Sequence, residues 1–359
     1  MGYQRNDPQG VEYLEMTMNN VVRIRGHLMK ISSQFPTSLD APAHIAVSEQ
    51  LGYDRAWLFD TPQQSPDVWM MLALAAERTQ RIGLGPGVLV PNLRQPMVNA
   101  SGAAALCALA PGRVAVAFGT GFTGARAMGA KSTTWAYLGE YVRVFRALLH
   151  GEIVDWGGGR MRMLHPVGHA PSRPIDVPVL ISALGPKGFA VAKELADGLF
   201  TVNGETAFAK EFTWAALGVH GTVLAEGESL DSPRVRAAAG PGNALAYHAA
   251  YEFGGDVTTL PGGQAWLDVV NQVPERERHL AVHDQHLVAL NAADRAAWAA
   301  GSWAAIPTTT VTGSAAQLAD RLAEYAEQGI TEIVYQPTGP DIAHELEAFI
   351  TAARTVPAG

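Results

Sequence analysis

The chain has a single cysteine, Cys107, among its 359 residues. One thiol excludes a disulfide framework and any metal site built on several cysteines, and it is typical of a protein from a reducing compartment. No apolar run reaches the roughly 18 residues that a membrane-spanning helix needs. The N-terminal segment MGYQRNDPQGVEYLE lacks the apolar core of a secretory signal. The sequence therefore predicts a cytoplasmic protein without a membrane anchor.

Positive charge is also scarce, because 26 Lys and Arg residues face 34 Asp and Glu residues, for a net charge of −8. An acidic chain is a poor partner for nucleic acid or an anionic membrane. A hydrophobic content of 48% with 17% charged residues excludes intrinsic disorder. No Walker, G-x-S-x-G, C-x-x-C or H-E-x-x-H motif occurs. We expect a globular protein that acts on a small molecule.

From about residue 39, amphipathic Ala- and Leu-rich segments alternate with short apolar runs. This rhythm favours parallel strands joined by helices, and about eight strands would close a (β/α)8 TIM barrel; an open doubly wound sheet is the alternative. We expect one domain over 1–359, with insertions near 151–176 and 254–307. The expected strands are 21–31, 55–59, 81–85, 113–118, 177–181, 197–201, 234–239 and 332–335. The expected helices are 38–51, 67–77, 96–109, 135–149, 187–195, 207–217 and 314–328.

Two glycine-rich stretches follow or end predicted strands, where barrel enzymes place their sites. Gly83, Gly85 and Gly87 fall within five residues. They indicate either bare main chain against a planar cofactor or an ordinary glycine-rich turn. Gly119, Gly121 and Gly124 form G-x-G-x-x-G, but no acidic residue follows about 20 positions later in a βαβ unit. We therefore reject a nicotinamide fingerprint.

A third stretch, Ser182-Ala-Leu-Gly-Pro-Lys-Gly-Phe189, joins a predicted strand to a predicted helix. Backbone N–H groups at a helix N-terminus, with Lys187 beside them, favour a phosphate group. The alternative is an ordinary helix start.

Asp60 follows a predicted strand. It is either a structural residue at the strand end or a hydrogen-bonding group in a pocket. His279, His283 and His286 would share one face of a helix. No second set of ligands accompanies them, so we expect a helix that lines the pocket mouth, or plain packing, and no metal site.

Taken together, ordered motifs resemble the bacterial-luciferase-like superfamily, and most closely its coenzyme F420 branch, which includes methylene-tetrahydromethanopterin reductase. The motifs are RIGLGPGVLVPNLRQP (81–96), PGRVAVAFGTG (111–121), PVLISALGPKG (178–188), ADGLF (196–200) and VTGSAAQLADRLAEYAEQGITEIV (311–334). The resemblance implies a luciferase-like barrel with a late insertion, F420 or FMN at the carboxyl ends of the strands, and a homodimer. It also implies a non-prolyl cis peptide at Gly87–Val88, a phosphate loop at 185–188, and a cofactor ring near 119–121. The implied cofactor-binding residues are Gly85, Gly87, Val88, Gly119, Thr120, Gly121, Ala183, Gly185, Pro186, Lys187 and Gly188.

The chain departs from the sugar-phosphate-oxidising relatives at two positions. Phe122 stands where they carry a Glu, and Thr61 where they carry a catalytic His, so sugar-phosphate oxidation is not expected. Phe122 and Trp69 suggest an apolar substrate. The first hypothesis is an F420-dependent oxidoreductase that exchanges hydride between the deazaflavin C5 and an apolar organic substrate. Asp60, as the catalytic acid, or a histidine of 279–286 would move the proton. The alternatives are an FMN-dependent monooxygenase, or a barrel without redox chemistry.

Overall fold

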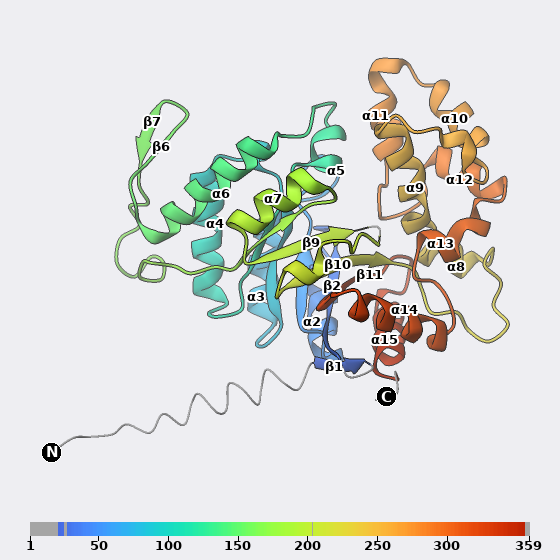
Figure 1. The fold of residues 1–359 in the computed structure, drawn as a ribbon, viewed down its shortest axis with the longest axis horizontal. Coiled ribbons are helices and arrows are strands. Elements are labelled where there is room, and N and C mark those ends of the chain that lie inside the picture. The colour runs from blue at the N-terminus through green and yellow to red at the C-terminus, as the bar shows by residue number, and fades with distance from the viewer. Residues whose placement is uncertain (1–20, 25–26, 203, 356–359) are drawn as a thin grey trace.

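Eight parallel strands form a closed barrel in the computed structural model, which describes residues 21–24, 27–202 and 204–355 (Figure 1). Strand β2 pairs with both β3 and β11, and this double pairing closes the sheet. The predicted (β/α)8 barrel is therefore confirmed. The strands are β2 (His27–Phe35), β3 (Arg55–Leu58), β4 (Gly83–Leu89), β5 (Val116–Phe118), β8 (Val179–Ser182), β9 (Gly198–Val202), β10 (Ala215–His220) and β11 (Glu332–Gln336). A further strand, β1 (Val21–Ile24), pairs antiparallel with β2.

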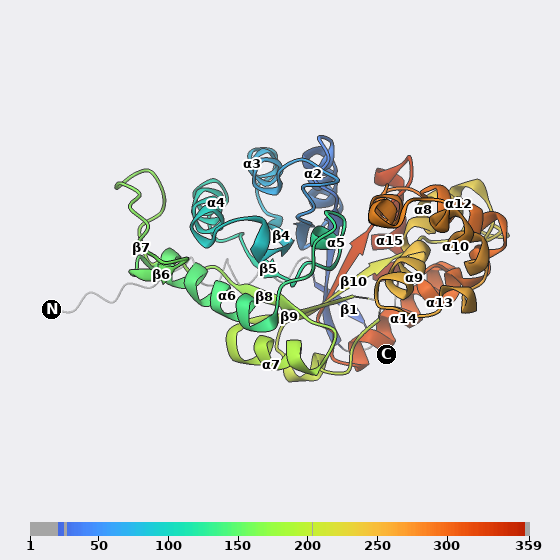
Figure 2. The ribbon, with the colours of Figure 1, turned by 90° about the horizontal axis from the view of Figure 1, so that it is seen from above.

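Helices pack around the outside of the barrel, as the view from above in Figure 2 shows. Their starts follow local capping chemistry: Asp67 accepts from the backbone of Trp69 and Met70, and Ser314 and Gln317 form a capping box. None of the described helices is long and apolar enough to cross a membrane. The segment on which the secretion prediction rested, residues 1–15, lies outside the described residues. The outer helices are α2 (Ala41–Leu51), α3 (Val68–Arg78), α4 (Pro96–Leu109), α6 (Trp135–His150), α7 (Pro186–Leu195), α14 (Ala315–Glu327) and α15 (Ile342–Arg354).

Two predicted elements are wrong. The helix expected at 207–217 is the short 3-10 helix η2 (Ala209–Glu211) followed by β10, and the strand expected at 234–239 is helix α8 (Pro233–Ala238). Ala215 to Val219 are all buried, so no polar residue marks the twofold alternation of a strand there. Ser232 caps α8 by accepting from the backbone of Val235, and Pro233 occupies its first turn.

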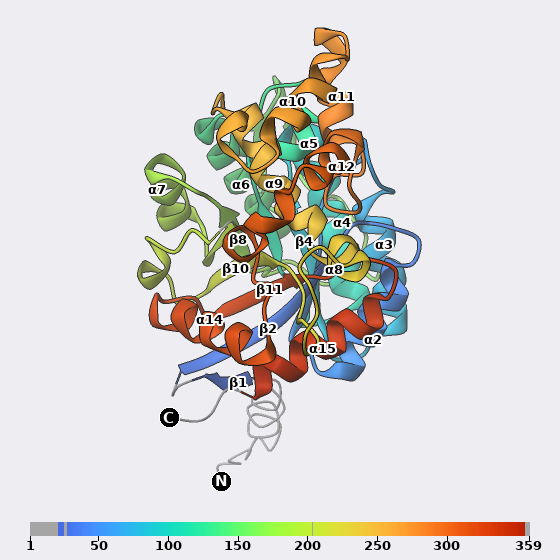
Figure 3. The ribbon, with the colours of Figure 1, turned by 90° about the vertical axis from the view of Figure 1, so that its right-hand side faces the viewer.

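Two insertions interrupt the barrel. The first, near 151–176, carries the hairpin of β6 (Val154–Trp156) and β7 (Gly159–Met161). The second lies between β10 and α14, so it extends beyond the segment expected near 254–307. It stands to one side of the barrel in Figures 1 and 3 and has an apolar cluster of its own around Trp266. Besides α8 it contains α9 (Gly240–Glu252), η3 (Val257–Thr259), α10 (Gly263–Asn271), η4 (Glu275–Glu277), α11 (Arg278–His283), α12 (Ala292–Ala299), η5 (Ser302–Ala305) and α13 (Ile306–Thr309).

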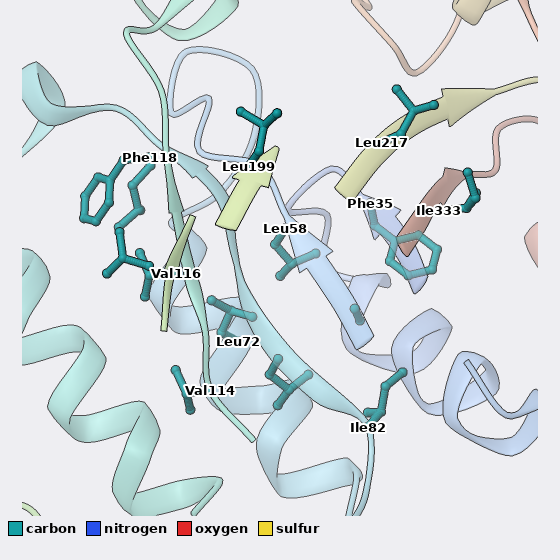
Figure 4. Close-up of a cluster of buried hydrophobic side chains, with 14 of the residues drawn as sticks. Phe35, Leu58, Leu72, Ile82, Val114, Val116, Phe118, Leu199, Leu217 and Ile333 are labelled. Atoms are coloured by element: carbon teal, nitrogen blue, oxygen red, sulfur yellow. The ribbon is translucent and has the colours of Figure 1, made fainter. Parts of the chain in front are cut away.

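Strand side chains alternate between two apolar clusters, as the period of a β-strand requires. On β5, Val116 and Phe118 belong to the outer cluster and Ala117 to the inner one. Figure 4 shows the outer cluster, in which strand residues such as Leu58 and Phe118 gather with Leu72 of α3. The outer cluster packs the helices against the strands, while the inner cluster fills the interior of the barrel.

Inside the barrel, the glycines of β4 make room for large side chains of β3. A Cβ at Gly83 would lie 2.7 Å from the Arg55 guanidinium carbon, and one at Gly87 would lie 2.9 Å from the Trp57 ring. At Gly85 it would lie only 1.9 Å from the backbone oxygen of Ala115. These glycines belong to a strand, so the turn interpretation is wrong. Trp57 and the β5 main chain occupy the space that a Cβ at Gly85 or Gly87 would need inside the barrel, and contact of these two glycines with a cofactor ring remains a prediction.

The substitution Gly85→Ala should destabilise the protein strongly, because its new methyl group meets a backbone oxygen that cannot move away without disturbing β5. Overpacking of this kind costs about 1–3 kcal/mol or more. Urea unfolding followed by circular dichroism measures the loss. Gly159→Ala is the matched control: its methyl group meets nothing closer than 3.7 Å, so its effect should stay within about 0.5 kcal/mol. Equal effects of the two substitutions would contradict the packing described for β4.

Candidate functional site at the carboxyl ends of the barrel strands

The carboxyl ends of five neighbouring strands stay partly exposed, although the barrel beneath them is buried. The order β4, β5, β8, β9, β10 in the sheet places them side by side. Since barrel enzymes carry their sites at this end, it is the candidate site. The partly exposed residues are Val88, Thr120, Ser182, Val202 and His220.

At the end of β4 the main chain is fixed by a side chain from β2. The peptide bond Gly87–Val88 is cis, as the family resemblance implied. The Gln34 side-chain amide, which is 8% exposed, donates to the Gly87 carbonyl over 2.6 Å. Sequence reasoning missed Gln34. Its only signal was a long polar side chain one residue before the apolar end of the strand that precedes the first barrel helix.

Two glycines allow the chain after β5 to lie close against the end of β4. A Cβ at Gly119 would lie 2.8 Å from the Val88 side chain, and one at Gly121 would lie 2.4 Å from Val90. Gly121 also has a φ of 86°, which favours glycine. The segment 119–121 therefore lies beside Val88, and Thr120 is its partly exposed member. The structure thus brings together the predicted residues of β4 and β5.

The start of α7 offers free backbone N–H groups. Gly185 is the N-cap and provides no side-chain hydrogen bond, and Pro186 occupies the first turn. The N–H groups of Lys187 and Gly188 lie in that first turn, where a helix has no internal acceptor. Gly188 packs so closely that a Cβ would lie 2.6 Å from Trp135 and 2.7 Å from Ala183. No side chain lies within 4 Å of a Cβ at Gly185, so this turn can accept an anionic group from outside.

Asp60 lies at the same end of the barrel but is held in an ion pair. Its side chain is 2% exposed and accepts from Arg94 over 2.5 Å, and Arg94 also donates to Asp67 over 2.7 Å. Burial raises the pKa of the Asp60 carboxyl, although the Arg94 contact opposes this effect. The pair fastens the loop after β3 to the segment after β4. A catalytic role for Asp60 remains a prediction.

The three histidines of 279–286 do not share a helical face, so that expectation is wrong. Helix α11 ends at His283, and the chain then turns through Gln285 and Leu287 with φ values of 55° and 60°. This turn nevertheless brings two of them to His248 of α9: the His286 ring lies 5.0 Å from that of His248 and 5.3 Å from that of His283. Across residues 21–24, 27–202 and 204–355 no group of three or more His, Cys, Asp or Glu side chains is arranged to hold a metal ion.

A cavity of about 320 Å³ lies where the insertion meets the barrel. Polar side chains predominate among the residues around it, which are Gln63, Gln64, Ala127, Leu280, His283, Asp284, Gln285, His286 and Val288. Beside it, Phe122 of α5 (Phe122–Arg126) stacks on Phe253 with ring centroids 4.8 Å apart. Trp69 lies elsewhere. It packs against Gly102 of α4 and donates to Asn99, so it does not line this cavity.

A family model described as luciferase-like monooxygenase matches residues 26–332. The chain belongs to the luciferase-like monooxygenase family. It is 27% identical over 326 residues to the 5,10-methylenetetrahydromethanopterin reductase of Archaeoglobus fulgidus, a match that covers 83% of this chain and 90% of the relative. It is 33% identical over 179 residues to an F420-dependent glucose-6-phosphate dehydrogenase of Intrasporangium calvum, covering 45% of this chain and 53% of that relative.

Solved structures of other proteins share the fold. The coenzyme F420 dependent tetrahydromethanopterin reductase of Methanopyrus kandleri superposes with a TM-score of 0.65 at 17% identity, over 92% of this chain and 99% of the other. The oxygenating constituent of a type II Baeyer-Villiger monooxygenase of Pseudomonas putida, in complex with FMN, gives a TM-score of 0.56 at 11% identity, over 90% and 98%. The fold therefore fits either kind of cofactor.

Acid should destabilise the protein through His286. Burial lowers its pKa, and the neighbouring His248, His283 and His220 lower it further, so folding disfavours its protonated form. The unfolded chain then binds more protons below about pH 6.5, and one such histidine lowers the free energy of unfolding by about 1.4 kcal/mol per pH unit.

Urea unfolding between pH 7.5 and pH 5 measures this slope. His286→Asn should flatten it, whereas the same substitution at the exposed His169 should not. A slope that His286→Asn leaves unchanged would contradict the effect of burial.

Proposed function

We propose that the protein is an F420-dependent oxidoreductase that exchanges hydride with an organic substrate. The observation that carries the proposal is the meeting of Val88 and Gly119 at the open end of the barrel, with the uncapped first turn of α7 following the next strand, β8. The names of the relatives, a methylenetetrahydromethanopterin reductase and F420-dependent dehydrogenases, support the same reaction class.

The residues at these strand ends would bind the cofactor at two places, its ring and its phosphate. The partly exposed Val88 and Thr120 would contact the ring. The amides of Lys187 and Gly188, with the Lys187 charge, would bind the phosphate. Bound there, a deazaflavin supplies hydride exchange at its C5. The protein contributes position and the exclusion of water.

The substrate would lie in the cavity beside the insertion. Ala127, Leu280 and Val288 give part of its wall an apolar character, and the Phe122 ring packs against His283 in that wall. This apolar part of the wall would contact the apolar skeleton suggested by the sequence, while the polar side chains that predominate elsewhere would contact polar groups of the substrate. The cavity volume lies at the lower end of ligand pockets, which favours a small molecule.

Binding of F420 to the purified protein tests this proposal. F420 fluorescence should change at micromolar cofactor. The substitution Lys187→Glu should weaken binding about tenfold or more, because it replaces a charge-assisted contact with repulsion. Lys193→Glu, the same charge change at the far end of α7, should have little effect. Binding of FMN instead, with reductant-dependent O₂ consumption, would favour the monooxygenase alternative, and binding of neither would refute a redox role.

We also propose that the protein forms a homodimer through the outer face of α3 and α4. Large apolar side chains on these adjoining helices stay exposed: Met70 by 65%, Val98 by 52% and Leu74 by 45%. Apolar residues gathered on one face of a soluble protein are typical of an interface. A second copy with the same face would cover them with twofold symmetry.

Sedimentation of the wild-type protein at micromolar concentration should give a dimer. The double substitution Met70→Glu and Leu74→Glu should give a monomer, since it places like charges at the interface. Leu164→Glu, at a still more exposed position on the first insertion, should leave the dimer intact. A monomeric wild-type protein would refute this assembly.

A further inference from the structure

A continuous chain of four side chains connects the insertion to the end of β5. Asp294 of α12 bonds His248 Nε2 over 3.0 Å, and His248 Nδ1 bonds His286 Nδ1 over 2.7 Å. His286 Nε2 then bonds the Thr123 hydroxyl over 3.1 Å. Thr123 follows Gly121 by two positions, so the chain leads from the centre of the insertion to the candidate site.

The hydrogen bonds of this chain all run in one direction. Asp294 is 4% exposed and also accepts from the Trp266 indole over 2.8 Å and from the Asn291 backbone over 3.1 Å. As a carboxylate, Asp294 only accepts hydrogen bonds. His248 must therefore donate through Nε2, which leaves its Nδ1 to accept from His286 Nδ1–H. The bare Nε2 of His286 then accepts the proton of the Thr123 hydroxyl.

Both histidines of the chain are buried, and one of them also lines the cavity. His248 is 1% exposed and His286 4%, so neither ring is hydrated in the way a surface histidine is. Burial favours the neutral form of His286 by lowering its pKa. His286 nevertheless lines the cavity, so it connects a buried carboxylate to a space that a ligand can enter.

We infer that Asp294, His248, His286 and Thr123 form a proton relay for a substrate hydroxyl or carbonyl group bound in this cavity. This inference rests on the proposed function and names the polar group that its substrate carries. Asp294 and His248 are positioning residues. The proton enters at Thr123, which is partly exposed and bonds the cavity-lining His286, so the substrate group would lie beside Thr123 at the edge of the cavity.

The proton balance follows from the bond directions. When an alcohol is oxidised, its O–H bond breaks and its proton passes to the Thr123 oxygen, while the original Thr123 proton moves to His286 Nε2. His286 releases its Nδ1 proton to His248 Nδ1, so the positive charge rests on His248 beside Asp294. The electron pair of the broken O–H bond forms the carbonyl, and the hydride lost from carbon would be taken up by a bound deazaflavin, which would supply the oxidant. Reduction of a carbonyl reverses each transfer.

A second group of charged and polar side chains lies beside the relay. His283 bonds Glu252 over 3.1 Å, and Glu252 also accepts from Arg126 over 2.5 Å. Burial opposes ionisation of Glu252, but its contacts with His283 and Arg126 keep its pKa low. His220 also faces His286. Because Glu252 already has its own cation in Arg126, the carboxylate that compensates a charged His248 is Asp294.

The first test uses solution NMR of the full chain without cofactor. Nitrogen chemical shifts should place the proton of His248 on Nε2 and that of His286 on Nδ1. Thr123→Val should change the Nε2 shift of His286 and leave His248 unaffected. Both rings protonated only at Nε2 would break the chain between them and would overturn the relay.

The second test measures turnover of F420 with propan-2-ol, cyclohexanol and benzyl alcohol. Thr123→Val should lower kcat on the order of 10²-fold with unchanged F420 affinity, whereas Thr123→Ser should retain most of the rate. Asp294→Asn should move the pH profile of kcat. Thr309→Val, which removes a hydroxyl bonded to Asn243 inside the insertion, is the control and should match the wild type.

Each outcome separates one claim from another. No binding of F420 refutes the proposed function. Binding without turnover of any of these alcohols overturns the assignment of a hydroxyl-bearing substrate. Turnover that Thr123→Val leaves at the wild-type rate overturns the relay, even where the proposed function stands.

Discussion

The packing of Trp57 inside the barrel is the constraint on which the candidate site depends. This side chain is fully buried, and its indole N–H donates over 3.0 Å to Glu332, which also accepts from Trp214. Its ring occupies the space that side chains at Gly85 and Gly87 would need. Because the ring fills the barrel up to Gly87, the next residue, Val88, is the one that reaches the open end. A ligand can therefore lie above the barrel interior but not within it.

The sequence predicted the elements that carry strong local signals. Asp67 and Ser314 cap their helices with side-chain hydrogen bonds, and those helices begin where they were expected. Strand β10 was mistaken for a helix because all but its last residue are buried, and such a run has no period that separates the two structures. The glycines of β4 were recognised as unusual, but their partner Trp57 lies on another strand. Only the folded barrel shows that packing, rather than a ligand, requires glycine there.

In the candidate site, too, features set by local sequence could be predicted, whereas contacts between distant segments could not. The segments 119–121 and 185–188 could be predicted from the sequence because a strand end or a helix start depends on a few consecutive residues. Gln34 acts on Gly87, 53 positions away, and His248 acts on His286 and Asp294 across turns that no local pattern predicts. Contacts of this kind depend on how the insertion folds onto the barrel. The spacing of the histidines suggested one helical face, whereas a turn through Gln285 and Leu287 brings two of them to a third.

The barrel and the insertion divide the chemistry between them. The proposed cofactor contacts are backbone groups and small residues at the strand ends, which also pack the ends of β4 and β5 together. The relay, by contrast, takes three of its four side chains from the insertion, which has an apolar cluster of its own around Trp266. Thr61 and Phe122 themselves offer no acid or base for such a step. In the proposed enzyme, changes in the insertion would therefore alter the proton relay and the substrate cavity without touching the residues proposed to hold the cofactor.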